Sequence, residues 1–87
     1  IKPLNDHELV AQAASGSRAA MEEIHRRYAS LVHAVLLARL PHAECEDCLQ
    51  EVFVRAMQGF ATLQNSAKLP QWLAAIARNV AAAHFRK

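Results

Sequence analysis

The sequence predicts an all-α fold, a compact bundle of about four helices. Its 87 residues include only 2 Gly and 3 Pro, too few for the many tight turns of a multi-stranded sheet. Hydrophobic residues make up 53% of the chain, enough for one core in a single small domain. In each long segment they recur every three or four positions, which is the period of a helix with one buried face.

Two helices are expected in the first half of the chain. Asn5 and Glu8 have the spacing of a capping box, and the Ser-Gly-Ser stretch at residues 15–17 ends the first helix. Ser17 can cap a second helix of about 22 residues, which Pro41 closes. Its apolar stripe comprises Met21, Ile24, Tyr28, Leu31, Val32, Val35, Leu36 and Leu40.

Two further helices are expected in the second half. One starts around residues 42–44 with acidic residues in its first turn, where the helix dipole favours negative charge. Pro70 fits the first turn of the other, which follows a polar connection at residues 62–68. The chain ends while its pattern is still helical, so we expect it to be part of a longer protein. The two apolar stripes comprise Cys45, Cys48, Leu49, Val52, Phe53, Ala56 and Phe60, then Leu69, Trp72, Leu73, Ile76 and Val80.

Charge is distributed unevenly along the chain, although the net charge is only +2. Residues 1–51 hold eight acidic and five basic side chains, whereas residues 52–87 hold five basic ones and no acid. This asymmetry favours two partners, one of them a polyanion. Taken alone, five charges over 36 residues are more typical of a solvated surface.

Several functional classes gain no support from the composition. No apolar run approaches the roughly 18–20 residues that cross a bilayer, and the first residues show no signal-peptide pattern. No nucleophile–base pair that would indicate a hydrolase or transferase is readable. We therefore expect a cytoplasmic protein that is not an enzyme, needs no cofactor and does not bind a membrane.

The stretch HAECEDC places His42, Cys45 and Cys48 at intervals of three residues. One helix cannot surround an ion with three such ligands, and a structural zinc site needs four; His33 would be the nearest additional ligand in sequence. Because both cysteines lie on the apolar stripe, and free cysteine is among the most buried residue types, we interpret them as core residues. A helical metal-binding or protein-interaction module built on these three side chains is the alternative.

Two linked motifs carry a family resemblance. Residues 46–56 follow the pattern E-D-hydrophobic-x-Q-E-V-F, with Cys48 at the hydrophobic position, and residues 72–80 follow W-L-x-x-I-A-R-N. Together with residues 9–28, they resemble region 2 of bacterial RNA polymerase sigma factors, in particular the extracytoplasmic-function group of the sigma-70 family. The resemblance extends from about residue 6 to residue 87. It implies a transcription initiation domain that recognises and melts the −10 promoter element.

The resemblance implies a polymerase-binding surface on the third helix. In the family, the helix with the E-D…Q-E motif docks on the β′ clamp helices of core RNA polymerase. The pattern agrees, because the matching residues lie off the apolar stripe; without the resemblance they would be a solvated helix face. These residues are Asp47, Gln50, Glu51, Val54 and Arg55.

The resemblance also implies a DNA-binding surface on the loop and the last helix. The family's loop captures a flipped base of the non-template strand at the −10 element. Amide side chains can read base edges and a lysine can hold a phosphate; without the resemblance this is a polar loop with a Ser66 helix cap. We expect Trp72 to be a core residue rather than a base-stacking platform. The implied DNA-binding residues are Gln64, Asn65, Ser66, Lys68, Gln71, Arg78, Asn79 and Arg86.

Other family features are implied with less detail. A second DNA-binding domain outside residues 1–87 would read the −35 element, and an anti-sigma factor would hold the protein inactive. Two departures from the family pattern leave the base preference open. Leu69-Pro70 stands where a Phe-Arg pair is common, and Ala83 stands where many members have Asp.

Overall fold

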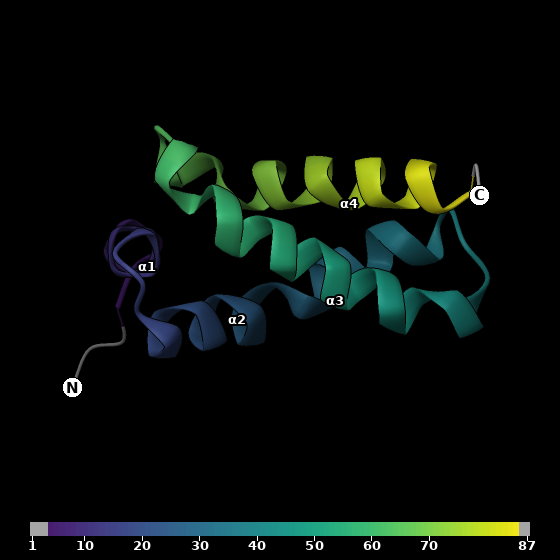
Figure 1. The fold of residues 1–87 in the computed structure, drawn as a ribbon, viewed down its shortest axis with the longest axis horizontal. Coiled ribbons are helices and arrows are strands. Elements are labelled where there is room, and N and C mark those ends of the chain that lie inside the picture. Colours follow the sequence, from purple (N-terminus) through teal and green to yellow (C-terminus); the bar gives the residue numbers. More distant parts are fainter. Residues whose placement is uncertain (1–3, 86–87) are drawn as a thin grey trace.

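The computed structural model describes residues 4–85, which form a bundle of four α-helices without strands (Figure 1). Two 3-10 turns connect α3 to α4, and α1 lies across the end of the bundle that is nearest to them. The helices α2 and α4 point the same way, so their C-terminal ends lie at the same end of the molecule (Figure 1). The all-α prediction is confirmed. The elements are α1 (Asp6–Ala14), α2 (Arg18–Leu37), α3 (His42–Gly59), η1 (Phe60–Thr62), η2 (Ser66–Lys68) and α4 (Leu69–Phe85).

The helix caps predicted at Asn5 and Ser17 are confirmed. The Asn5 side chain accepts a hydrogen bond from the Glu8 backbone N–H at 2.8 Å, and the Glu8 carboxylate accepts one from the Asn5 N–H at 3.2 Å. Gly16 has a φ of 98°, a conformation that costs glycine little because it has no Cβ. The Ser17 hydroxyl then accepts the Ala20 N–H at 3.2 Å. These local hydrogen bonds set where α1 and α2 begin.

Three details of the helix predictions are wrong. The helix α2 ends at Leu37, so Leu40 is buried outside the helix; Pro41 disfavours helical backbone at Leu40. Leu31 is 37% exposed, since the buried line of α2 runs through Ile24, Val32 and Leu36 and leaves Leu31 at its edge. Phe60 is buried, but it belongs to η1 rather than to α3.

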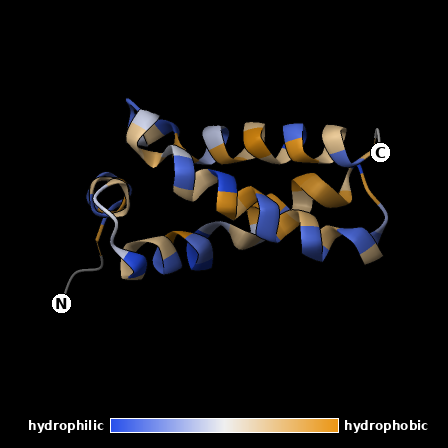
Figure 2. Cartoon of the chain, in the orientation of Figure 1, coloured by the Kyte–Doolittle hydropathy of each residue, from blue (hydrophilic) through white to orange (hydrophobic). Residues whose placement is uncertain are grey.

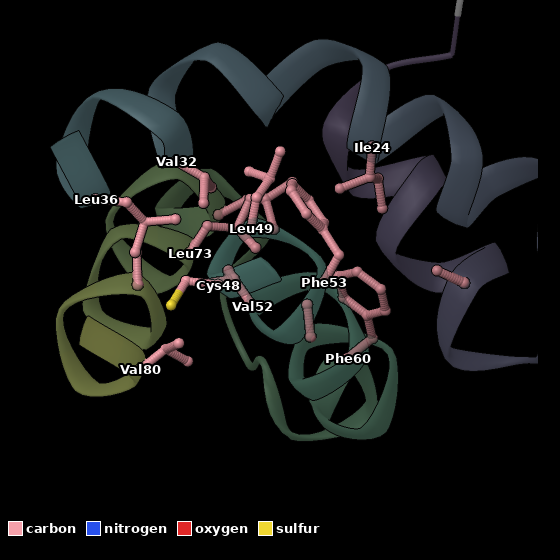
Figure 3. Close-up of a cluster of buried hydrophobic side chains, with 14 of the residues drawn as sticks. Ile24, Val32, Leu36, Cys48, Leu49, Val52, Phe53, Phe60, Leu73 and Val80 are labelled. Carbon is pink, nitrogen blue, oxygen red and sulfur yellow. The ribbon is translucent and has the colours of Figure 1, made fainter. Parts of the chain in front are cut away.

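The core lies between α2, α3 and α4, with α1 closing one end. Hydrophobic segments, orange in Figure 2, recur along the helices, and no polar or charged residue within 4–85 is buried. Cys45 is fully buried and Cys48 is 3% exposed; Figure 3 shows Cys48 beside Val80 and Leu36. The prediction that both cysteines pack in the core is confirmed. The fully buried large side chains are Leu9, Ile24, Val32, Leu36, Cys45, Val52, Leu69 and Leu73.

The side chains of the HAECEDC stretch do not converge. His42 is exposed whereas the two cysteines are in the core, and the rings of His33 and His42 have centroids 6.0 Å apart. Within residues 4–85, no three His, Cys, Asp or Glu side chains are grouped closely enough to hold a metal ion. In the same part of the chain, no helix is both long and apolar enough to cross a membrane.

A polar cluster holds α1 against α2. The Tyr28 hydroxyl donates a hydrogen bond to the Asp6 carboxylate, and Arg27 Nη1 lies 3.4 Å from the other Asp6 oxygen. Arg27 Nε also donates to Glu23 at 2.9 Å, and this hydrogen bond lowers the pKa of the Glu23 carboxyl. Burial, followed by the hydrogen bond to Asp6, raises the pKa of Tyr28 to about 12.

The raised pKa of Tyr28 predicts a loss of stability in alkaline solution. The unfolded chain releases this proton near its ordinary value of 10, whereas the folded chain keeps it until about pH 12. The contribution of Tyr28 to the free energy of unfolding is therefore complete below pH 10 and is lost as the pH rises towards 12. We expect Tyr28→Phe to flatten this decline in the free energy of unfolding, as measured by urea denaturation at several pH values. If the free energy of unfolding declined equally with pH in the parent chain and in Tyr28→Phe, the decline would not come from Tyr28.

Candidate partner and nucleic-acid interfaces

An exposed ridge runs along α3 on the side opposite to the core. It comprises the five residues that the motif predicted, and all of them are exposed. Positions three, four and seven apart share one face of a helix, so burying Cys48, Val52 and Ala56 turns the ridge outward. Arg55 Nε donates to Glu51 at 2.9 Å, and both side chains are about half exposed. The ridge comprises Asp47, Gln50, Glu51, Val54 and Arg55.

The ridge separates two hollows of different chemistry. Gln50 and Val54 line the hollow towards α2, together with His25 and Met57; Val54 is 45% and Met57 51% exposed. The remaining ridge residues line the hollow towards α4, beside Ala83 and His84. The ridge thus presents uncharged residues, Gln50 and Val54, on one side and charged residues on the other, and a partner that fits it has to match both.

One contact ties the start of α3 to the end of α4. His84 Nε2 lies 2.5 Å from a Glu44 carboxylate oxygen. These two residues are 40 positions apart, and they join the ends of two helices that meet at one end of the bundle. The contact therefore helps to orient the ridge relative to α4.

The loop between α3 and α4 exposes polar side chains at one end of the bundle. Gln64, Asn65 and Lys68 are exposed and Ser66 is half-buried. Asn65 Oδ1 accepts the Ala67 backbone N–H at 3.0 Å and caps η2. The alternative of a Ser66 helix cap is therefore wrong, because Asn65 occupies the N-cap position of η2. Asn65 Nδ2 makes no hydrogen bond with the residues that the structure describes.

His7 is a neighbour of this loop that the sequence did not indicate. Its Nδ1 atom lies 3.2 Å from the Ser66 hydroxyl, and α1 packs against both 3-10 turns. The two residues are 59 positions apart, so no local pattern relates them. The hydroxyl that we expected to face DNA therefore already has a protein partner, and α1 supports the loop from the side.

The exposed face of α4 continues the loop, because α4 begins immediately after η2. Gln71, Arg78 and Asn79 are all exposed, and Arg86 lies outside the described residues. Trp72 is half-buried against the core, with its ring centroid 5.6 Å from that of Phe60, so the core interpretation of Trp72 is confirmed. The exposed side chains of α4 therefore follow the exposed loop amides directly along the chain.

The structure is thus an all-α bundle with two exposed faces of different chemistry. A model of the family described as sigma-70 region 2 matches residues 24–87. The chain is also 32% identical over 81 residues to the ECF RNA polymerase sigma factor BldN of Streptomyces coelicolor. The chain therefore belongs to the sigma-70 region 2 family, as a region 2 domain of an extracytoplasmic-function sigma factor.

These comparisons also define how much of a sigma factor the chain represents. The match covers 91% of the chain but only 31% of the Streptomyces protein. No solved structure matches the chain. The family assignment makes the chain a transcription initiation domain.

Proposed function

We propose that the domain binds core RNA polymerase through the α3 ridge and the non-template strand of the −10 element through the loop and α4. The observation that carries this proposal is the separation of the two surfaces. The loop and α4, residues 60–85, contain no acidic side chain, whereas Asp47 and Glu51 lie on the ridge. A negatively charged DNA strand is therefore attracted to the surface of the loop and α4 and repelled by the carboxylates of the ridge. The β′ clamp helices are the proposed partner of the ridge.

Promoter melting follows from the chemistry proposed for the loop. A site that binds an unstacked base, and not a paired one, favours the open strand over the duplex. Because Asn65 Oδ1 caps η2, its Nδ2 group is the part of the amide that remains to read a base. It is a donor and matches an acceptor on a base edge. Gln64 has a complete amide, and Lys68 can hold the adjoining phosphate.

The proposal extends to the longer protein. The chain spans less than a third of the relative that it matches, which supports a two-domain protein whose other domain reads the −35 element. An anti-sigma factor is its proposed regulator, as implied by the family. The function requires binding and no catalytic step, and its partners place it in the cytoplasm.

Substituting Asn65 tests the base-reading role. We expect the 87-residue chain to bind labelled single-stranded −10 oligonucleotides more tightly than scrambled strands, as measured by fluorescence anisotropy at several salt concentrations. Asn65→Ser keeps a side-chain oxygen that can cap η2 but removes the amide donor. It should weaken binding by about tenfold, since one base contact contributes about 1–3 kcal/mol.

Asn65→Ala separates base reading from loop structure. It removes both the donor and the cap, so its effect should equal or exceed that of Asn65→Ser. If Asn65→Ser bound like the parent while Asn65→Ala lost affinity, Asn65 would act only by shaping the loop. Equal affinity of the parent chain for scrambled strands would rule out base reading altogether.

A further inference from the structure

We propose that a hollow between the C-terminal ends of α2 and α4 is a second DNA site, which binds a phosphate and the adjoining base of the same single strand. The proposal rests on the DNA-binding function proposed for the loop and α4. The hollow has a volume of about 380 Å³. It is lined by Arg39, Arg78, Ala81, Ala82 and Phe85.

The two arginines of this hollow are not neutralised by carboxylates. Arg39 and Arg78 take part in none of the ion pairs found within residues 4–85, whereas Arg26, Arg27 and Arg55 each pair with a glutamate. No acidic residue lines the hollow. Arg39 Nη1 donates a hydrogen bond to the Val35 carbonyl at 3.4 Å, so the guanidinium keeps its charge and further N–H groups. Two guanidinium groups without a carboxylate partner beside one hollow are well suited to a phosphate, whose oxygens accept N–H groups in bidentate geometry.

Phe85 supplies a surface on which a base can stack. Its exposed fraction of 76% exceeds that of each other exposed large hydrophobic residue within 4–85. Aromatic side chains beside basic groups are the usual platform for unpaired bases. The small side chains of Ala81 and Ala82 leave the space between the ring and the arginines open. The hollow therefore offers charge for a phosphate and an aromatic face for a base.

The hollow is continuous with the DNA surface proposed above. Gln71, Arg78 and Phe85 are spaced seven residues apart, so they lie close to one line along α4. The 17 residues of α4 span about 26 Å, the length of roughly seven stacked nucleotides of one strand. A strand held by the loop at the start of α4 thus reaches the hollow at its end. This continuity favours DNA over an acidic peptide as the occupant.

The experiment compares short and extended strands bound to the full 87-residue chain. A strand of about five nucleotides, centred on the −10 element, should reach the loop but not the hollow, given the length of α4. Strands extended by five nucleotides at the 5′ or the 3′ end test both polarities. We expect one extension to raise the affinity of the parent chain about tenfold, since stacking contributes about 1–3 kcal/mol per base.

Two variants assign this gain to its parts. Arg39→Ala and Phe85→Ala should each reduce the gain from the extension and leave the affinity for the short strand unchanged. Arg39→Ala should also lower the salt dependence of binding to the extended strand by about one released counterion. An extension made of abasic nucleotides has phosphates but no bases to stack on Phe85. With this extension, Phe85→Ala should no longer change the affinity, whereas Arg39→Ala should still reduce it. Arg26→Ala and Met57→Ala, which change exposed residues elsewhere, should keep the full gain.

The outcomes separate this proposal from the one on which it rests. If the parent chain binds the short strand in an Asn65-dependent way but gains nothing from either extension, only the second site is overturned. A gain that persists in both variants, or that requires a duplex extension, overturns it as well. If the parent chain binds neither strand, both proposals fail.

Discussion

Leu73→Ala is expected to lower the free energy of unfolding of the domain by about 2–5 kcal/mol. Leu73 is fully buried, and it projects from α4 into the core that α2 and α3 complete (Figure 3). Removing its three terminal carbons leaves a cavity that well-packed neighbours fill only in part. Small domains have a free energy of unfolding of about 5–15 kcal/mol, so this substitution removes a large fraction of it. Urea denaturation followed by circular dichroism measures it.

Leu37→Ala is the matched control, because it removes the same atoms from the surface. Leu37 is 42% exposed at the end of α2, and such a substitution should change the free energy of unfolding by less than about 0.5 kcal/mol. Similar losses from both substitutions would contradict the placement of Leu73 in the core.

Asp47→Ala combined with Gln50→Ala is expected to weaken binding to the β′ clamp helices by about tenfold or more. Both residues are exposed on the α3 ridge, and they face its two different hollows. The pair therefore removes one contact from each side of the proposed interface. Interface residues of this kind each contribute about 1–2 kcal/mol or more when they lie near the centre. Biolayer interferometry with the purified β′ coiled coil measures the change.

A second double variant shows whether position matters or only charge. Glu46→Ala with Gln12→Ala also removes one acid and one amide, both exposed, but neither residue belongs to the ridge. It should bind the coiled coil like the parent chain. The ridge variant should in turn keep its affinity for single-stranded DNA, and Asn65→Ser should keep its affinity for the coiled coil. Loss of both activities in either variant would contradict two separate surfaces.

Much of the fold was predictable because the information is local. The capping box at Asn5, the left-handed Gly16 and the cap at Ser17 act within a few residues, so their spacing identifies them. The apolar period likewise predicted the buried residues of α3, and therefore which of its faces is exposed. In α4 it predicted Leu69, Leu73 and Val80 but missed the buried Ala77 and Ala81. The positions of the ridge and of the polar loop follow from these patterns.

The errors occurred where a local pattern left two outcomes open. Asn65 and Ser66 can both cap a helix, and the exact start of η2 decides that Asn65 does so. Leu31 fits the apolar spacing of α2, but no neighbouring helix covers it well enough to bury it. Periodicity indicates the side of a helix that faces the core and not how far the covering helices extend.

By itself, the sequence determined the helices, the caps of α1 and α2, the side of each helix that faces the core and the family motifs that assign the domain to transcription initiation. Only the tertiary structure decided which exposed side chains are neighbours. It brings His7 to Ser66, Glu44 to His84, and Arg39 to the hollow beside Phe85. These pairs are 40 or more residues apart, and their contact depends on how α1, α2 and α4 pack against α3. Such packing is set by the shapes of all the buried side chains together, so no single segment encodes it.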